Sequence, residues 1–154
     1  CKTCVMDTSD PDIKFNISGV CNHCLEAQVE LPKYRFTKEQ EANNLKVITG
    51  QIKADAKGKY DSIVGLSGGV DSSYVAHLAK SLGLNPLVVH FDNGWNSEKS
   101  VSNIKKIVDK CGFDLETYVI NWQEFKDLQR SFFKAGVVDI EILTDHAIMA
   151  TMFQ

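Results

Sequence analysis

The segment that is most informative about the fold of this chain is Ser62-Ile63-Val64-Gly65-Leu66-Ser67-Gly68-Gly69-Val70-Asp71-Ser72. Its first part is mostly apolar, as in a strand buried in a parallel sheet. After it, Val75, Leu78, Ala79 and Leu82 recur at the spacing of one helix face, and Gly83 caps that helix. The paired glycines therefore lie at a junction between a strand and a helix, where open α/β sheets bind nucleotide phosphates.

Strands and helices continue to alternate beyond this junction. Apolar runs predict two more strands, and helical spacing predicts two more helices, over residues 87–91, 115–120, 101–111 and 122–132 respectively. Residues 137–143 are expected to be extended, and Asp145 is expected to open a final helix. The alternation predicts a doubly wound α/β fold with a parallel sheet whose strands are buried on both faces. We expect this chain to leave that sheet incomplete.

Composition excludes several classes of protein. The 154 residues are 44% hydrophobic and 24% charged, which suits a globular chain with one real core. A net charge of −3, spread along the chain, argues against nucleic acid as the main partner. We expect a cytoplasmic protein without a membrane partner, because the sequence has no long apolar run and no leader. The chain starts at Cys1 and ends in a helical pattern, so we expect a fragment of a longer protein.

The junction residues have the composition of a phosphate-binding loop. The glycines let backbone N–H groups converge on an anion, the helix dipole adds roughly half a positive charge, and the Ser67 and Ser72 hydroxyls can donate hydrogen bonds. No lysine follows the glycines, so this is not a Walker A loop. With Asp71 available to position Mg²⁺, the loop suits ATP that is attacked at its α-phosphorus. The alternative is a tight turn in which Asp71 caps the helix.

Further polar residues are expected at the same edge of the sheet. Asp92 follows the second strand and could meet the nucleotide or its metal, although Asp92-Asn93-Gly94 also has the form of a turn. Asp145 and His146 could meet substrate, whereas Thr144 or Asp145 could simply cap a helix. We therefore assign nucleotide binding to Ser67, Gly68, Gly69, Val70, Asp71, Ser72, Ser73 and Asp92, and catalysis to Asp71, Asp145 and His146.

The first 36 residues have the pattern of a small metal module. Cys1-x-x-Cys4 and Cys21-x-x-Cys24 have the spacing of a structural four-cysteine zinc site, whose metal would supply the folding energy that this irregular, polar segment lacks. Disulfides and an iron-sulfur cluster remain alternatives. His23 is expected to be a solvated turn residue, and Cys111 an ordinary core residue.

Residues 37–59 are predicted to form a linking helix that starts with a Thr37–Gln40 capping box. Residues 60–154 are predicted to form the α/β domain.

Residues 67–72 match in full the Ser-Gly-Gly-x-Asp-Ser signature of the ATP pyrophosphatase, or PP-loop, superfamily, which the sequence therefore resembles. That resemblance implies an adenine nucleotide alpha hydrolase-like fold, ATP with Mg²⁺, and adenylation chemistry. The two Cys-x-x-Cys pairs, the extended motif from Gly65 to Tyr74, Phe91-Asp92-Asn93-Gly94-Trp95-Asn96 and Thr144-Asp145-His146-Ala147 together look like the N-acetyl sugar amidotransferase family. Proteins of that family are more than twice as long.

This second resemblance implies an enzyme of bacterial surface-polysaccharide or flagellin-sugar biosynthesis. Such an enzyme adenylates an acetamido oxygen on a nucleotide-linked N-acetyl sugar and lets ammonia displace AMP, leaving an acetamidino group. The ammonia is expected from a separate glutaminase subunit, because no cysteine here has the setting of a glutaminase nucleophile.

Two other functions are consistent with the same motifs. A tRNA-thiolating enzyme also joins a cysteine module to this ATP loop, but residues 1–36 carry four Lys/Arg against five Asp/Glu and so lack a basic RNA-binding face. A non-catalytic nucleotide sensor would bind ATP without releasing pyrophosphate. Pyrophosphate release and dependence on a glutaminase partner distinguish these possibilities.

Overall fold

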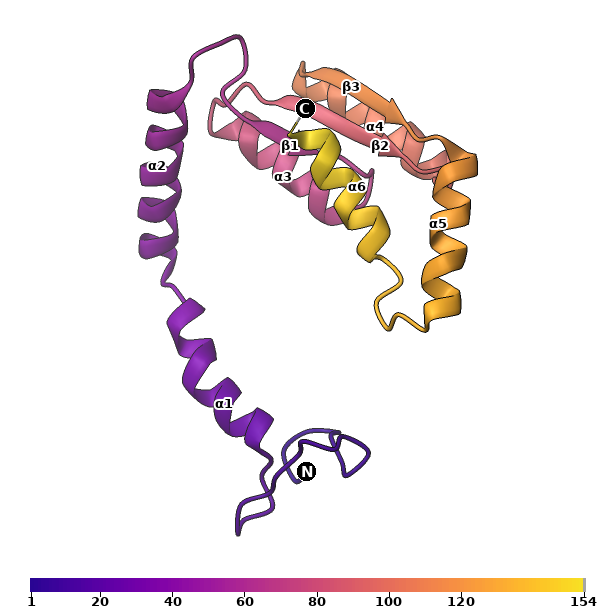
Figure 1. Ribbon diagram of the computed structural model, residues 1–154. Coiled ribbons are helices and arrows are strands. Elements are labelled where there is room, and N and C mark those ends of the chain that lie inside the picture. Colours follow the sequence, from indigo (N-terminus) through magenta and orange to yellow (C-terminus); the bar gives the residue numbers. More distant parts are fainter. Residues whose placement is uncertain (154) are drawn as a thin grey trace. The chain divides into compact units, whose positions relative to one another are not determined.

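The computed structural model describes residues 1–153. Contacts divide the chain into two compact units, Cys1–Val47 and Ile48–Gln154, and the division falls within helix α2 (Lys38–Asp55). Figure 1 shows the elements of both units in chain order.

The first unit is less irregular than its sequence suggests. Helix α1 (Asn22–Glu30) begins directly after Cys21 and contains Cys24, and the 3₁₀ helix η1 (Leu31–Tyr34) follows it, so the expectation of an irregular segment is wrong there. A local cap explains α1, because the Cys21 side chain at its N-cap accepts a hydrogen bond from the Cys24 backbone N–H. The capping box of α2 is confirmed, since Thr37 and Gln40 exchange side-chain bonds to backbone N–H groups of 2.9 and 3.2 Å.

The second unit is built on a parallel sheet. Within residues 1–153 this sheet has three strands in the order β1 (Ile63–Gly65), β2 (Leu87–Asp92) and β3 (Asp114–Val119). All pairing is parallel, with Val64 opposite Val88 and Val88 opposite Leu115. The predicted α/β fold with a parallel sheet is therefore confirmed, and all strand carboxyl ends lie at one edge.

Helices cover both faces of this sheet. Helix α3 (Val70–Ser81) links β1 to β2, and α4 (Glu98–Cys111) links β2 to β3. These successive right-handed crossovers place both helices on one face, where they pack against each other. After α5 (Trp122–Ala135), helix α6 (Ile142–Met152) contacts β2 from the opposite face (Figure 1). The arrangement is doubly wound, as predicted.

The core lies between the sheet and the pair α3 and α4. Its buried members are Leu66, Ala76, Ala79, Val88, Ile104, Cys111 and Phe113, so the prediction for Cys111 is confirmed. Of the strands, only β2 is well buried on both faces in the described chain, because it is central. The expectation of full burial is wrong for the outer strands, where Ile63 is 46% and Val119 67% exposed.

The segment between α5 and α6 departs from the sequence prediction. Gly136 ends α5 with a φ of +65°, and residues 137–141 form a turn, so the extended segment predicted over 137–143 is wrong. Helix α6 begins at Ile142 with Glu141 at its N-cap, whereas Asp145 lies one turn further on. The prediction that Thr144 or Asp145 caps the helix is also wrong. A side-chain turn at Asp139, whose Oδ1 accepts from the Glu141 N–H at 3.0 Å, redirects the chain before the expected start.

Candidate nucleotide site and four-cysteine cluster

The glycine loop joins β1 to α3 in a conformation that needs Gly68. Gly68 has a φ of +77°, and a Cβ built there would lie 2.3 Å from the backbone carbonyl oxygen of Ser100. Gly69 differs, because its φ is −80° and its Cβ would meet only the Ser67 Oγ at 3.5 Å. The fold therefore requires a glycine at position 68 but not at 69. Steric freedom at 69 leaves open space beside the loop backbone.

The loop serines and Asp71 surround the start of α3. The Ser72 Oγ accepts from the Ser67 N–H at 3.2 Å and lies 3.1 Å from the Ser67 Oγ, while the Ser73 hydroxyl donates back to the Gly69 carbonyl. Gly69 is the N-cap, and Asp71 lies exposed in the first turn, so the alternative reading of Asp71 as the cap is wrong. A glycine cap has no side chain to cover the first N–H groups of the helix. Those groups and the helix dipole suit an anion.

A buried histidine fastens the residue before the loop. His90, on β2, is 6% exposed, and its Nδ1 lies 2.9 Å from the Leu66 carbonyl oxygen. Its Nε2 lies 3.4 Å from the Asn96 Nδ2, which also donates to the Asp92 Oδ1 at 3.0 Å. Because an amide nitrogen only donates, this network assigns the proton of a neutral His90 to Nδ1. No local sequence pattern indicates this contact, because 24 positions separate His90 from Leu66.

Residues of α4 and its N-cap also hold the glycine loop in place. The Asn103 side-chain amide donates to the Gly68 carbonyl at 3.2 Å, and Ser97 caps α4 by accepting from the Ser100 N–H at 3.1 Å. The capped turn holds the Ser100 backbone against Gly68. Asn103 was missed in the sequence because only the fold brings it to the loop.

Asp92 lies at the last position of β2 and closes a turn. Its Oδ1 accepts from the Gly94 N–H at 2.9 Å as well as from Asn96. The Gly94 hydrogen bond, together with Asn96 and the nearby His90, holds the pKa of the Asp92 carboxyl below its ordinary value of 3.8, against a smaller effect of burial. The turn alternative for Asp92 is thus present in the structure, and its role in nucleotide binding stays a prediction.

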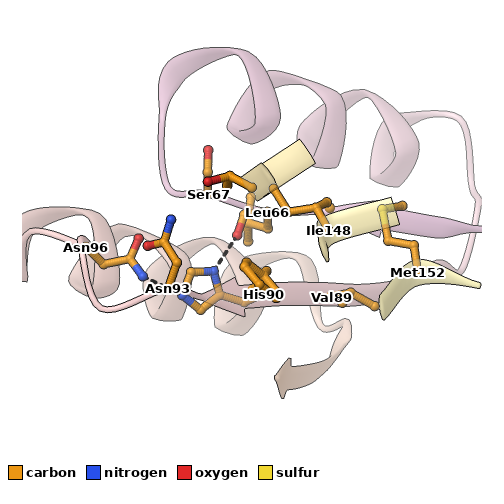
Figure 2. Close-up of a pocket in the computed structure, with 11 residues that line it drawn as sticks. Leu66, Ser67, Val89, His90, Asn93, Asn96, Ile148 and Met152 are labelled. Atoms are coloured by element: carbon orange, nitrogen blue, oxygen red, sulfur yellow. Dashed lines mark hydrogen bonds between the residues drawn. The ribbon is translucent and has the colours of Figure 1, made fainter. Parts of the chain in front are cut away.

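A pocket of about 330 Å³, the β-edge pocket, opens beside the loop (Figure 2). Its walls are Gly65 to Ser67, Val89 to Phe91, Asn93, Asn96 and the α6 residues Thr144, Ile148 and Met152. Ser67 joins the pocket to the glycine loop. Within the described chain, Asp145 and His146 are exposed and do not line this pocket, whereas their neighbour Thr144 does. Their catalytic assignment stays a prediction.

The four cysteines of the first unit converge. The Sγ atoms of Cys1, Cys4, Cys21 and Cys24 all lie within 4.8 Å of one another. The Cys1–Cys24 and Cys4–Cys21 sulfur separations are 3.9 and 3.7 Å. A tetrahedral site with metal–sulfur bonds of about 2.3 Å has sulfur–sulfur edges of about 3.8 Å, so the cluster is compatible with zinc. All four are free thiols in this geometry, which disfavours the disulfide alternative.

Hydrogen bonds from the backbone and between the thiols shift the pKa values of two cysteines in this cluster. Backbone N–H groups of Thr3 and Cys21 donate to the Cys1 sulfur at 3.3 Å. A hydrogen bond from the Met6 backbone lowers the pKa of Cys4, while bonding to Cys4 and burial raise the pKa of Cys24 to about 12. Thiolates this close together repel one another, and a bound divalent cation would offset that repulsion. His23 is not a solvated turn residue, because it lies in α1 and pairs with Asp10 at 2.7 Å.

These features define the second unit as a parallel α/β nucleotide-binding domain of the PP-loop class. The family model described as NAD synthase matches residues 42–139, which is more than half of the chain. The chain therefore belongs to the NAD synthase family. No curated protein matches it. No helix in the described residues is long and apolar enough to cross a membrane.

A solved structure shows the same fold over part of its length, and two others are similar to this chain with TM-scores below 0.5. NMN synthetase from Francisella tularensis is 18% identical, with a TM-score of 0.55, over 77% of this chain and 50% of that one. NH3-dependent NAD synthetase from Campylobacter jejuni is 17% identical, with a TM-score of 0.49, over 71% and 47%. NAD+ synthetase from Burkholderia pseudomallei is 14% identical, with a TM-score of 0.48, over 77% and 57%. The chain spans about half the length of these structures.

Proposed function

We propose that the protein adenylates the acetamido oxygen of a nucleotide-linked N-acetyl sugar with ATP and replaces that oxygen by ammonia. The observation that carries the adenylation step is the glycine loop, with its uncapped helix start, beside the β-edge pocket. Membership in the NAD synthase family supports the use of ATP. The resemblance to the N-acetyl sugar amidotransferase family supports an N-acetyl sugar as the acceptor.

The geometry suggests where each part of ATP would bind. The adenosine would occupy the β-edge pocket, whose walls are largely apolar, and the triphosphate would extend past Ser67 onto the N–H groups of Gly69 and α3. Asp71, exposed in the first turn of α3, would hold Mg²⁺ against the phosphates. Mg²⁺ would offset charge that develops on the leaving pyrophosphate.

The reaction balances in two steps. The acetamido carbonyl oxygen attacks the α-phosphorus, the bond from that phosphorus to the bridging oxygen breaks, and pyrophosphate leaves. Ammonia then adds to the activated carbon, the carbon–oxygen bond to AMP breaks, and the product keeps the extra proton as an acetamidinium group. Loop N–H groups that are already oriented would stabilise the charge in the first step.

Ammonia has to come from outside this chain. Four of its five cysteines lie in the cluster, and Cys111 is 7% exposed within the core, so none is placed as a glutaminase nucleophile. We propose a separate glutaminase subunit as the source. Free ammonium at high concentration should replace that partner in the test.

The test uses the whole protein with ATP, Mg²⁺, ammonium and a panel of nucleotide-linked N-acetyl sugars. We expect AMP and pyrophosphate in equal amounts, and a sugar product in which NH has replaced one oxygen, detected by mass spectrometry. AMP formation only with tRNA would overturn the sugar reaction in favour of base thiolation, which also pairs a cysteine cluster with this loop. ATP binding without any pyrophosphate release would indicate a nucleotide sensor.

A further inference from the structure

A second pocket of about 270 Å³ lies next to the β-edge pocket, and we call it the aromatic pocket. The two pockets share Asn93 and Thr144. Anything bound in the aromatic pocket would therefore lie beside a nucleotide in the β-edge pocket. Sites for drug-sized ligands usually measure about 300 to 1,000 Å³, so this volume suits a single substituted ring and not a whole nucleotide-linked sugar.

The walls of this pocket combine a flat aromatic surface with polar groups. Trp95 is 66% exposed, and its ring is held edge to face against Trp122 with centroids 6.0 Å apart. Phe125, on α5 and 6% exposed, also lines this pocket. An indole face that is both fixed and exposed can pack against another apolar face without further ordering of the side chain.

The polar residues of the pocket keep hydrogen-bonding capacity. Asn93 uses its Oδ1 to accept from the Trp95 N–H at 3.1 Å, which leaves its NH₂ group as a donor. Gln129 donates from Nε2 to the Ile140 carbonyl at 3.3 Å, which leaves its Oε1 as an acceptor. Glu141 sits at the N-cap of α6, and its side chain makes no capping bond within the described chain.

We propose that the aromatic pocket binds the sugar ring of the acceptor, with a C–H face on Trp95 and hydroxyl groups on Gln129 and Glu141. A sugar ring has one flat apolar face and a polar edge, and this combination matches a tryptophan face flanked by an amide and a carboxylate. Asn93, shared by both pockets, would then donate to the acetamido oxygen on its path to the α-phosphorus. This inference rests on the proposed function.

Adenine is the other flat ring in the reaction. Kinetic measurements can show whether the sugar ring or the adenine ring packs on Trp95. In the whole protein with ammonium as nitrogen source, Trp95→Ala should raise the KM for the sugar about tenfold, as expected for loss of roughly 1.4 kcal/mol of stacking. The KM for ATP and the melting temperature should stay unchanged. Trp95→Phe should recover most of the loss, and Tyr34→Ala, at an exposed aromatic in the first unit, should match the wild type.

Two results would overturn the proposal. One is an unchanged KM for the sugar in Trp95→Ala. The other is a raised KM for ATP instead, which would place adenine on Trp95. Glu141→Gln provides a second variant, and it should raise the KM for the sugar without changing the KM for ATP.

A binding measurement separates this proposal from the proposed function. Saturation-transfer NMR with methyl N-acetylglucosaminide as the probe should show transfer with the wild type and with Tyr34→Ala, but not with Trp95→Ala. Transfer that depends on Trp95, without turnover of any sugar, would reject the reaction and keep the pocket assignment. Absence of transfer with the wild type, or transfer that survives Trp95→Ala, would reject the pocket assignment.

Discussion

His90 on β2 donates from its Nδ1 to the Leu66 carbonyl over 2.9 Å, and Leu66 directly precedes the glycine loop. The same imidazole accepts from Asn96, which also bonds to Asp92. Thus His90 on β2, supported by Asn96 after the strand, holds the backbone that leads into the loop. Since His90 is buried and its neighbours Asp92 and Asn96 are half-buried, losing one member leaves shielded polar groups without partners.

We expect His90→Ala to lower both stability and nucleotide affinity. The Leu66 carbonyl would lose its buried partner, which typically costs about 1–3 kcal/mol, and the loop would lose its anchor. The measurements are chemical denaturation and calorimetric titration with a non-hydrolysable ATP analogue. His77→Ala, at an exposed position on α3, is the matched control and should change neither quantity much. Equal behaviour of the two variants would contradict the anchoring role.

Substitution by alanine should affect the melting temperature differently at the two loop glycines. Gly68→Ala forces a positive φ and a 2.3 Å contact with the Ser100 carbonyl, so we expect a clear loss of melting temperature. Gly69→Ala meets only an ordinary 3.5 Å contact, so its melting temperature should stay close to that of the wild type. If phosphates approach the loop as proposed, Gly69→Ala should still weaken binding of the ATP analogue. Unchanged affinity in that folded variant would contradict the phosphate site.

Asp92 should contribute stability that depends on pH. Its folded pKa lies below the ordinary value of 3.8, so the carboxylate stabilises the fold at pH values above the unfolded pKa. This contribution should disappear as the pH falls through the lower folded pKa. The gap in unfolding free energy between the wild type and Asp92→Asn should therefore be full at neutral pH and shrink in acid. A gap that stays constant from pH 7 to about pH 3 would show that the charge is unimportant.

The cysteine cluster should carry one metal ion per chain. We expect elemental analysis to find zinc in the wild type and to find it lost in Cys21→Ser, because a tetrahedral site needs all four thiolates. Cys111→Ala, which alters the one cysteine outside the cluster, should keep the metal. Iron accompanied by sulfide and visible absorption would instead identify an iron-sulfur cluster.

Much of the fold could be predicted because it depends on the spacing of residues that are close together in the sequence. The strand before Ser67, the helix after Gly69 and the Thr37–Gln40 capping box depend on residues a few positions apart. The predictions failed where a single side chain changed the local outcome. Cys21 starts an unexpected helix by capping it, and the turn at Asp139 moves the start of α6 ahead of Thr144.

Most strands and helices of the α/β domain, the glycine loop and the two cysteine pairs could be predicted from the sequence, because each of these is a pattern of close neighbours. The tertiary structure brings His90 to Leu66 across 24 positions and Asn103 to Gly68 across 35. It also decided that Thr144, not Asp145 or His146, lines the pocket beside the loop. The physical reason is that such contacts depend on strand register and helix packing, which bring distant residues together without leaving a local pattern.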